Sequence, residues 1–408
     1  MEVEIGRGKK ARRAYGFDDI AIVPSRRTRD PDDIDISWKL GDYRFELPLM
    51  ASAMDGVVSP ATAATVGRLG GLAVLNLEGI WTRFEDADAQ LERIAGLPKE
   101  LATREMQDIY AEPIKPELIT RRIEEIKAEG VVVAASLTPQ RVTRYCDLAL
   151  EAGLDILVIQ GTVISAEHVS TVTTPLNLKE FIRELPIPVV VGGCASYHTG
   201  LHLMRTGAAG VLVGVGPGAA CTTRGVLGIG VPQATAIADV AAARSQHMLE
   251  TGEYVKVIAD GGMRNGGDVS KAFACGADAV MIGSPLARAY EAPGRGYHWG
   301  MATFHPSLPR GARVKTTQNG TLEQILLGPA HENDGTFNLM GSLRTSMATC
   351  GYEDIPAFHK AEVMVAPALQ SEGKQLQQEQ GIGMGATAAA VPHPETNGVT
   401  AGDPALVE

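Results

Sequence analysis

The sequence lacks the features that define several large classes of protein. No apolar run is long enough to cross a membrane, and the basic N-terminal stretch has no apolar core of the kind that a secretion signal needs. Only five cysteines occur, and their odd number and wide spacing fit neither a disulfide framework nor a zinc site. We therefore expect a cytoplasmic protein with reduced thiols and no membrane partner.

Net positive charge is also missing. The 408 residues carry a formal net charge of −11 at pH 7, which argues against a nucleic-acid-binding surface and against binding to anionic membranes. A phosphorylated small molecule stays compatible with this charge, because local loops decide whether such a ligand binds. The G-x-G-x-x-G fingerprint of dinucleotide-binding sheets does not occur either.

The sequence does contain a repeated pattern that starts at residue 47. Eight short apolar runs are each followed by a segment with helical spacing, and the runs are continuous, as in parallel strands covered on both faces. Eight such units in about 240 residues predict an α/β fold, a single-domain (β/α)8 TIM barrel, with a doubly wound sheet as the less favoured alternative. The expected strands are Leu47–Ala53, Leu72–Leu77, Val131–Leu137, Ile156–Ile159, Val189–Val191, Val211–Val213, Val255–Ala259 and Ala279–Ile282. Helices are expected at Pro60–Leu69, Pro139–Ala152, Tyr197–Thr206 and Gly267–Cys275.

The barrel is expected over residues 47–370, after an N-terminal arm over residues 1–46. Residues 81–130 are longer than one connection needs, so they predict an outer helical elaboration, with helices at Glu100–Tyr110 and Pro116–Glu129.

Three further segments follow the last expected strand. Residues 295–320 are Gly-rich and polar and predict an active-site loop or flap. A C-terminal segment over 371–380 leads into residues 381–408, which contain no aromatic residue and are rich in Ala, Gly and Pro; this composition predicts a disordered tail.

A glycine-rich loop carrying Cys221 follows the sixth expected strand. Gly214, Gly216 and Gly218 let backbone amides and carbonyls approach a small ligand or ion. The loop amides and the nearby Arg224 favour a thiolate, which makes Cys221 a candidate nucleophile. Taken by itself, the loop could instead hold a buried structural cysteine. The residues at the other strand ends favour the interpretation of Cys221 as a nucleophile.

The ends of the seventh and eighth strands predict a phosphate cradle. Asp260-Gly261-Gly262 and Gly283-Ser284 supply exposed backbone amides at the face where barrel strands converge. The Asp260 carboxylate suits two vicinal hydroxyls, so together these residues predict a ribose 5′-phosphate site. An N-cap turn is the plainer reading of Gly283-Ser284 alone.

Three more side chains are weaker candidates on their own. Met54 and Met301 could hold a flat base between them, although a methionine is more often part of a core. The Tyr297 hydroxyl could donate to a phosphate, although a tyrosine is more often a packing residue.

A series of motifs in order along residues 5–370 resembles the IMP dehydrogenase/GMP reductase family. They are Phe-Asp-Asp-Ile (17–20), Ser-Ala-Met-Asp (52–55), Gly-Val-Gly-Pro-Gly-Ala-Ala-Cys-Thr-Thr-Arg (214–224), Val-Pro-Gln-Ala-Thr-Ala (231–236), Val-Ile-Ala-Asp-Gly-Gly-Met-Arg (257–264), Gly-Asp-Val-Ser-Lys-Ala (267–272), Gly-Ala-Asp-Ala-Val-Met-Ile-Gly-Ser (276–284), Glu-Ala-Pro-Gly (291–294) and Gly-Ser-Leu-Arg-Thr-Ser-Met (341–347).

The resemblance implies a covalent mechanism on a purine nucleoside monophosphate. Cys221 would attack C2 of the purine, hydride would pass to NAD+, and Thr223 would help to activate the water that releases XMP. The implied substrate-binding residues are Ser52, Met54, Asp260, Gly261, Gly262, Gly283, Ser284, Tyr297, Gly300 and Met301, and the implied cofactor-binding residues are Gln160 and Gly214.

The resemblance also implies K+ and a homotetramer. Carbonyls of Gly216, Gly218 and Cys221 would bind K+, and Glu372-Gly373 of a neighbouring subunit would complete the site.

The chain departs from the family pattern at several positions. The regulatory CBS-domain pair is missing, so the chain is expected to be a divergent short form. Ala219 replaces a phosphate-binding Ser, and Gln160 replaces an Asp that holds the cofactor ribose. Arg310 stands where the reductases have a catalytic Glu, and it is the candidate for activating water.

Three functions are therefore weighed. IMP dehydrogenase is favoured by the intact Cys-Thr-Thr-Arg loop, the apparent K+ segment and the loss of the reductase Glu. GMP reductase, which uses NADPH, is the second, because short chains without the CBS pair are typical of it. A catalytically silent purine-nucleotide-binding relative is the third, suggested by Ala219 and Gln160.

Overall fold

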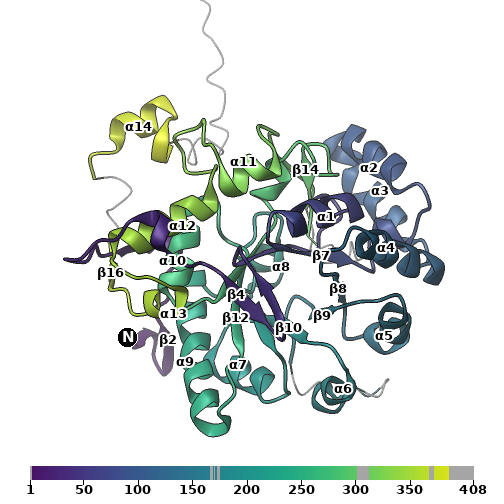
Figure 1. Cartoon of the computed structure of the whole chain (residues 1–408), viewed down its shortest axis with the longest axis horizontal. Helices are drawn as coiled ribbons and strands as arrows, with labels where there is room; N and C mark the ends of the chain where they lie inside the picture. The colour runs from purple at the N-terminus through teal and green to yellow at the C-terminus, as the bar shows by residue number, and fades with distance from the viewer. Residues whose placement is uncertain are drawn as a thin grey trace, which may run out of the picture.

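A closed barrel of eight parallel strands forms the centre of the computed structural model, which describes residues 2–165, 169, 171, 175–300, 312–366 and 372–385 (Figure 1). All eight expected strands are confirmed, with ends that shift by up to three residues. They are β6 (Leu49–Ala51), β7 (Leu72–Asn76), β8 (Ala134–Leu137), β9 (Ile156–Gln160), β10 (Val189–Cys194), β11 (Gly210–Val213), β12 (Lys256–Asp260) and β13 (Ala279–Ile282).

Helices surround the barrel, as the TIM-barrel prediction requires (Figure 1). The four expected helices correspond to α1 (Pro60–Arg68), α5 (Val142–Glu151), α7 (Tyr197–Met204) and α10 (Gly266–Ala274). The others around the barrel are α4 (Pro116–Ala128), α6 (Leu178–Glu184), α8 (Thr223–Leu227), α9 (Gln233–Thr251), α11 (Leu322–Leu327), α12 (Leu339–Thr349) and α13 (Ile355–Phe358). None of the helices in the described ranges has the length and apolar character needed to span a bilayer.

The barrel interior is closed at its N-terminal end by part of the predicted arm. The hairpin of β4 (Trp38–Leu40) and β5 (Tyr43–Phe45) buries Trp38, Leu40 and Phe45 against interior residues such as Met50 and Met281. Trp38 Nε1 also donates to the Leu47 carbonyl at 2.9 Å. Residues 1–46 are therefore partly integral to the barrel core.

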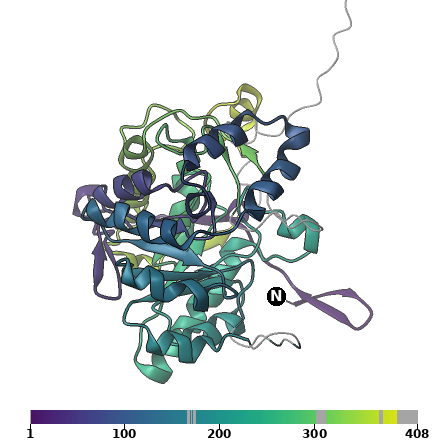
Figure 2. The ribbon, with the colours of Figure 1, turned by 90° about the vertical axis from the view of Figure 1, so that its right-hand side faces the viewer.

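The rest of the arm follows the outside of the barrel. The hairpin of β1 (Glu2–Gly6) and β2 (Lys9–Arg12) projects from the body (Figure 2), and β3 (Ile20–Ile22) pairs with β16 (Val363–Val365).

The predicted elaboration over residues 81–130 is smaller than expected. Its two expected helices are present as α3 (Lys99–Ala111) and α4, and α2 (Ala87–Gly96) was not predicted. However, α4 buries Leu118, Ile119, Ile123 and Ile126 and packs beside α1 and α5, so it is a helix of the barrel ring. Only α2 and α3 are added to the barrel.

The predicted flap is partly described. A two-stranded ribbon of β14 (Tyr297–His298) and β15 (Val314–Lys315) forms its base, and residues 301–311, with Met301 and Arg310, lie outside the described residues. Near the C-terminus, α14 (Gln375–Gln380) leads into a 3-10 turn at Gly383–Gly385, so the predicted tail begins with five structured residues, 381–385. The remainder of 381–408 lies outside the described residues.

Candidate active site

A cavity of about 990 Å³ opens at the carboxyl ends of the barrel strands. This is the end where the loops that follow parallel barrel strands converge. Its walls come from the ends of β6, β9, β11, β12 and β13, and residues 16–18 of the N-terminal arm add to them. Of the predicted site residues, those that line the cavity are Ser52, Met54, Gln160, Gly214, Gly216, Gly218, Cys221, Thr223, Asp260, Gly261, Gly262, Gly283, Ser284 and Gly300.

The cysteine loop lies directly against the phosphate-cradle residues. Gly261 has a φ of +76°, and a side-chain carbon there would lie 3.3 Å from Gly218. At Gly214 such a carbon would lie 2.1 Å from the Asp260 carbonyl oxygen, a distance that no real contact reaches. Glycine is thus required at these positions for the loop and the end of β12 to form one wall.

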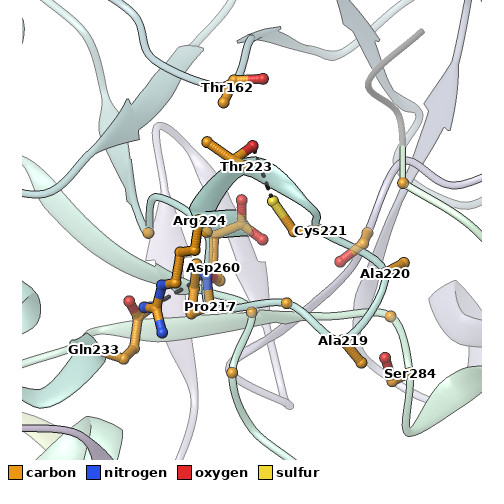
Figure 3. A pocket seen from close by; sticks show the side chains of 18 of the residues that line it. Thr162, Pro217, Ala219, Ala220, Cys221, Thr223, Arg224, Gln233, Asp260 and Ser284 are labelled. Atoms are coloured by element: carbon orange, nitrogen blue, oxygen red, sulfur yellow. Dashed lines mark hydrogen bonds between the residues drawn. The ribbon is translucent and has the colours of Figure 1, made fainter. Parts of the chain in front are cut away.

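Cys221 presents its sulfur to the cavity beside Thr223 (Figure 3). The thiol is 3.2 Å from Thr223 Oγ1, and Thr223 is buried, so its hydroxyl is fixed next to the sulfur. Because a thiol held in this way faces open space, the structural-cysteine reading is not needed to explain the loop. The arrangement suits a nucleophile with a neighbouring hydroxyl that can hold water.

The cation expected near Cys221 lies elsewhere. Arg224 extends toward Gln233 rather than toward the sulfur (Figure 3), and its guanidinium donates to the Val231 carbonyl at 2.8 Å. The Arg224 guanidinium therefore holds the loop after α8, and the Cys221 thiol contacts Thr223.

Asp260 is half-buried, and its carboxyl has one hydrogen-bond partner among the described residues. Gln160 Nε2 donates to Asp260 Oδ2 at 3.2 Å, while burial raises the pKa of Asp260 to about 7. Gln160 Oε1 is buried and has no partner in the described part of the chain. The other carboxylate oxygen and this amide oxygen are suited to accept hydrogen bonds from ligand hydroxyls.

Gln233 is a site residue that the sequence reasoning missed. Its Nε2 donates to the Val213 carbonyl at 2.7 Å and to the Asp260 carbonyl at 3.1 Å, so it ties the ends of β11 and β12 together. The motif Val-Pro-Gln was visible in the sequence, but nothing in the spacing indicates that this side chain reaches back across two strands.

The sequence reasoning also missed His298, which lies next to the predicted residue Tyr297. The Tyr297 ring stacks on the Arg313 guanidinium, 4.3 Å from the ring centre, and Tyr297 is not among the residues that line the cavity. The adjacent His298 instead contacts the predicted phosphate cradle, with Nε2 2.8 Å from Ser284 Oγ.

The predicted metal residues are divided between two regions. Gly216, Gly218 and Cys221 share the cavity loop, whereas Glu372 and Gly373 lie just before α14, at the periphery of the molecule (Figure 1). This separation is compatible with a second subunit supplying them. Across the described ranges, no cluster of three His, Cys, Asp or Glu residues is arranged for a metal ion.

A partly buried tyrosine connects the added helices to the cavity loop. Tyr110 of α3 donates to Asp55 Oδ2 and accepts a hydrogen bond from Trp299 Nε1 at 2.6 Å. Trp299 directly precedes Gly300, which lines the cavity. Burial raises the pKa of Asp55 to about 6. Tyr110 provides hydrogen bonds to both the Asp55 carboxyl and the Trp299 indole, which would otherwise lose these partners.

We expect Tyr110→Phe to lower the free energy of unfolding by about 2 kcal/mol, because Asp55 Oδ2 and the Trp299 N–H would lose this buried partner. Tyr145→Phe is the matched control, since the hydroxyl of this buried tyrosine has no hydrogen-bond partner among the described residues and its loss should change stability by only a few tenths of a kcal/mol. Urea unfolding of both variants measures the difference. Equal stability of the two variants would contradict the role given to the Tyr110 hydroxyl.

Comparisons of the sequence with family models and with known proteins agree on one family. The family model described as "IMP dehydrogenase / GMP reductase domain" matches residues 14–375. An "Uncharacterized oxidoreductase" of Mycolicibacterium smegmatis is 49% identical, with 89% of this chain and 99% of the relative covered. An inosine-5′-monophosphate dehydrogenase of Methanocaldococcus jannaschii is 27% identical, with 89% of this chain and 95% of that protein covered.

A solved structure agrees with both the sequence matches and the barrel. An IMP dehydrogenase/GMP reductase-like protein from Corynebacterium glutamicum is 46% identical and superposes with a TM-score of 0.85, covering 90% of this chain and 98% of that one.

Proposed function

The chain belongs to the IMP dehydrogenase/GMP reductase family of oxidoreductases, and from this premise we propose that it is an IMP dehydrogenase that converts IMP to XMP. The observation that carries the proposal is the cavity itself. Its lining includes the Cys221 thiol beside Thr223, together with Asp260 and the Gly283-Ser284 turn. A purine nucleotide has a reactive ring, a vicinal diol and a phosphate, which match these groups in turn.

Each residue has a separate task in the proposed reaction. Asp260 accepts hydrogen bonds from the ribose hydroxyls, while Gly262, Gly283 and Ser284 bind the phosphate. Cys221 sulfur forms a bond to C2 of the purine, and C2 loses a hydride. Water held at Thr223 then adds to C2, the carbon–sulfur bond breaks, and the thiol is regenerated with release of XMP. Arg310, outside the described residues, is proposed to activate that water.

The cavity has groups that fit a dinucleotide cofactor. Gln160 Oε1 is a buried acceptor without a partner in the described ranges, and Gly214 also lines the cavity. We propose that these two residues contact the nicotinamide riboside part of NAD. The cofactor would supply the acceptor for the hydride that leaves C2.

We also propose a K+ site and a homotetramer. Gly216 has a φ of +80°, and a side-chain carbon there would lie 2.7 Å from Arg224, so the loop is built around bare backbone. Such a loop can present the carbonyls of Gly216, Gly218 and Cys221 to one cation. Glu372 and Gly373 of a neighbouring subunit would complete the shell in a tetramer placed in the cytoplasm.

We expect NADH to form, read by its absorbance, when the protein is incubated with IMP and NAD+, and we expect no NADPH consumption with GMP. The intact cysteine loop supports this direction, and replacement of K+ by Li+ should slow the reaction at least tenfold. NADPH consumption with GMP alone would establish the reductase instead. Nucleotide binding without turnover in either direction would favour the silent relative.

A further inference from the structure

A chain of three polar side chains leads from the flap base to the predicted phosphate cradle. His298 Nε2 lies 2.8 Å from Ser284 Oγ, and His298 Nδ1 lies 2.7 Å from Thr316 Oγ1. Thr316 follows β15, whose pairing with β14 is extended by a hydrogen bond from Thr316 N to the Gly296 carbonyl at 2.7 Å. The three residues come from different parts of the chain and meet through the ring of His298.

The His298 ring is neutral in this position. It is almost fully buried, with 1% of its surface exposed, and burial lowers its pKa to about 4. A neutral imidazole has one N–H donor and one nitrogen acceptor. Because hydroxyls lie at both ends, the three residues can be connected in only two directions.

The two directions present different atoms to the cavity. If Nδ1 donates to Thr316, Nε2 accepts the Ser284 hydroxyl hydrogen, and Ser284 offers only lone pairs to a ligand. If Thr316 donates to Nδ1, the Nε2–H donates to Ser284 Oγ, and the Ser284 hydroxyl hydrogen is free. A phosphate needs donors, so it is compatible only with the second direction.

Ser284 is important at this end of the cavity because its side chain supplies a hydroxyl. Ala219, which has no hydroxyl to contribute, lines the same cavity, and Figure 3 labels both residues. A hydroxyl that points the wrong way there would leave a phosphate oxygen facing lone pairs.

Resting on the proposed function, we propose that His298 is a positioning residue that directs the Ser284 hydroxyl toward the phosphate of a bound nucleotide. His298 acts through Ser284 and does not itself line the cavity. The phosphate selects the direction Thr316 to His298 to Ser284, in which each group donates to the next. The residue therefore contributes to the preference for a nucleotide over its nucleoside.

Two substitutions of similar size and polarity test the two ring nitrogens of His298 separately. His298→Gln keeps an amide donor at the position of Nε2, near Ser284. His298→Asn keeps a polar group near Thr316 but does not reach Ser284. Calorimetric titration with IMP, and competition of inosine against IMP, give the two dissociation constants.

We expect His298→Asn to raise the dissociation constant of IMP about tenfold and to leave that of inosine within twofold, with His298→Gln close to the wild-type protein. Ser284→Ala should also cost about tenfold. Because His298 acts through Ser284, the double variant Ser284→Ala/His298→Asn should bind IMP as Ser284→Ala does.

Three results would overturn the proposal. Unchanged IMP binding in His298→Asn is one, and a hundredfold loss in the double variant is the second, since it would show that His298 acts independently of Ser284. Equal losses for IMP and inosine, the third, would show that His298 only supports the fold. If the wild-type protein bound none of IMP, XMP and GMP, the proposed function would fail together with the relay.

Discussion

Cys221→Ala is expected to abolish turnover while the protein still binds the mononucleotide. Without the sulfur, no covalent bond forms at C2, and hydride loss from C2 has no route that the other residues supply. The loss should be at least a thousandfold in kcat, as for other essential nucleophiles. Binding should change by less than threefold, because the ribose and phosphate contacts come from Asp260 and Ser284. Steady-state kinetics and calorimetry measure the two quantities on one preparation.

Cys275→Ala is the matched control for a general effect of removing a thiol. Cys275 follows α10 on the outside of the barrel, and burial raises the pKa of its thiol to about 12, so it is inert. Its replacement should leave kcat within twofold. Labelling with iodoacetamide should modify Cys221 and be prevented by bound IMP. Turnover that survives in Cys221→Ala would disprove the covalent mechanism.

The fold could be predicted because its strands carry a strong local signal. Runs such as Val211–Val213 are buried on both faces, so their apolar pattern is continuous and easily distinguished from a helix. The assignment of α4 could not be made in this way. Its apolar face has the same helical spacing as that of α2 or α3, and only packing against α1 and α5 shows that it belongs to the ring.

The site residues also fall into two groups: those that the strand pattern predicts and those that only tertiary contacts reveal. Asp260 ends β12, Ser284 lies just after β13, and Cys221 lies on the loop that follows β11, so the barrel topology brings all three to one face. His298 and Gln233 reach the site through their side chains, from elements whose order in the sequence does not reveal the contact. The direction of Arg224 is likewise decided by the Val231 carbonyl, which spacing does not show.

Asp260→Asn is expected to weaken mononucleotide binding about a hundredfold. In the proposed complex the carboxylate accepts hydrogen bonds from two ribose hydroxyls, whereas an asparagine of the same shape turns one acceptor into a donor and opposes one hydroxyl. The analogue 2′-deoxy-IMP is the matched control ligand. Wild-type protein should bind it at least tenfold more weakly than IMP, and Asp260→Asn should discriminate much less. Equal discrimination by both proteins would place the diol elsewhere.

The pH dependence of IMP binding tests whether Asp260 binds the ribose in its ionised form. Burial raises the pKa of Asp260 to about 7 in the free protein, so the group is mostly protonated at pH 6 and mostly ionised at pH 8. Because the ionised form accepts both hydroxyls, the dissociation constant of IMP should fall about tenfold across this interval. The phosphate of IMP also titrates near pH 6, and Asp260→Asn removes only the contribution of the carboxyl. A wild-type profile that parallels that of Asp260→Asn would show that Asp260 does not bind the ribose as the ionised group.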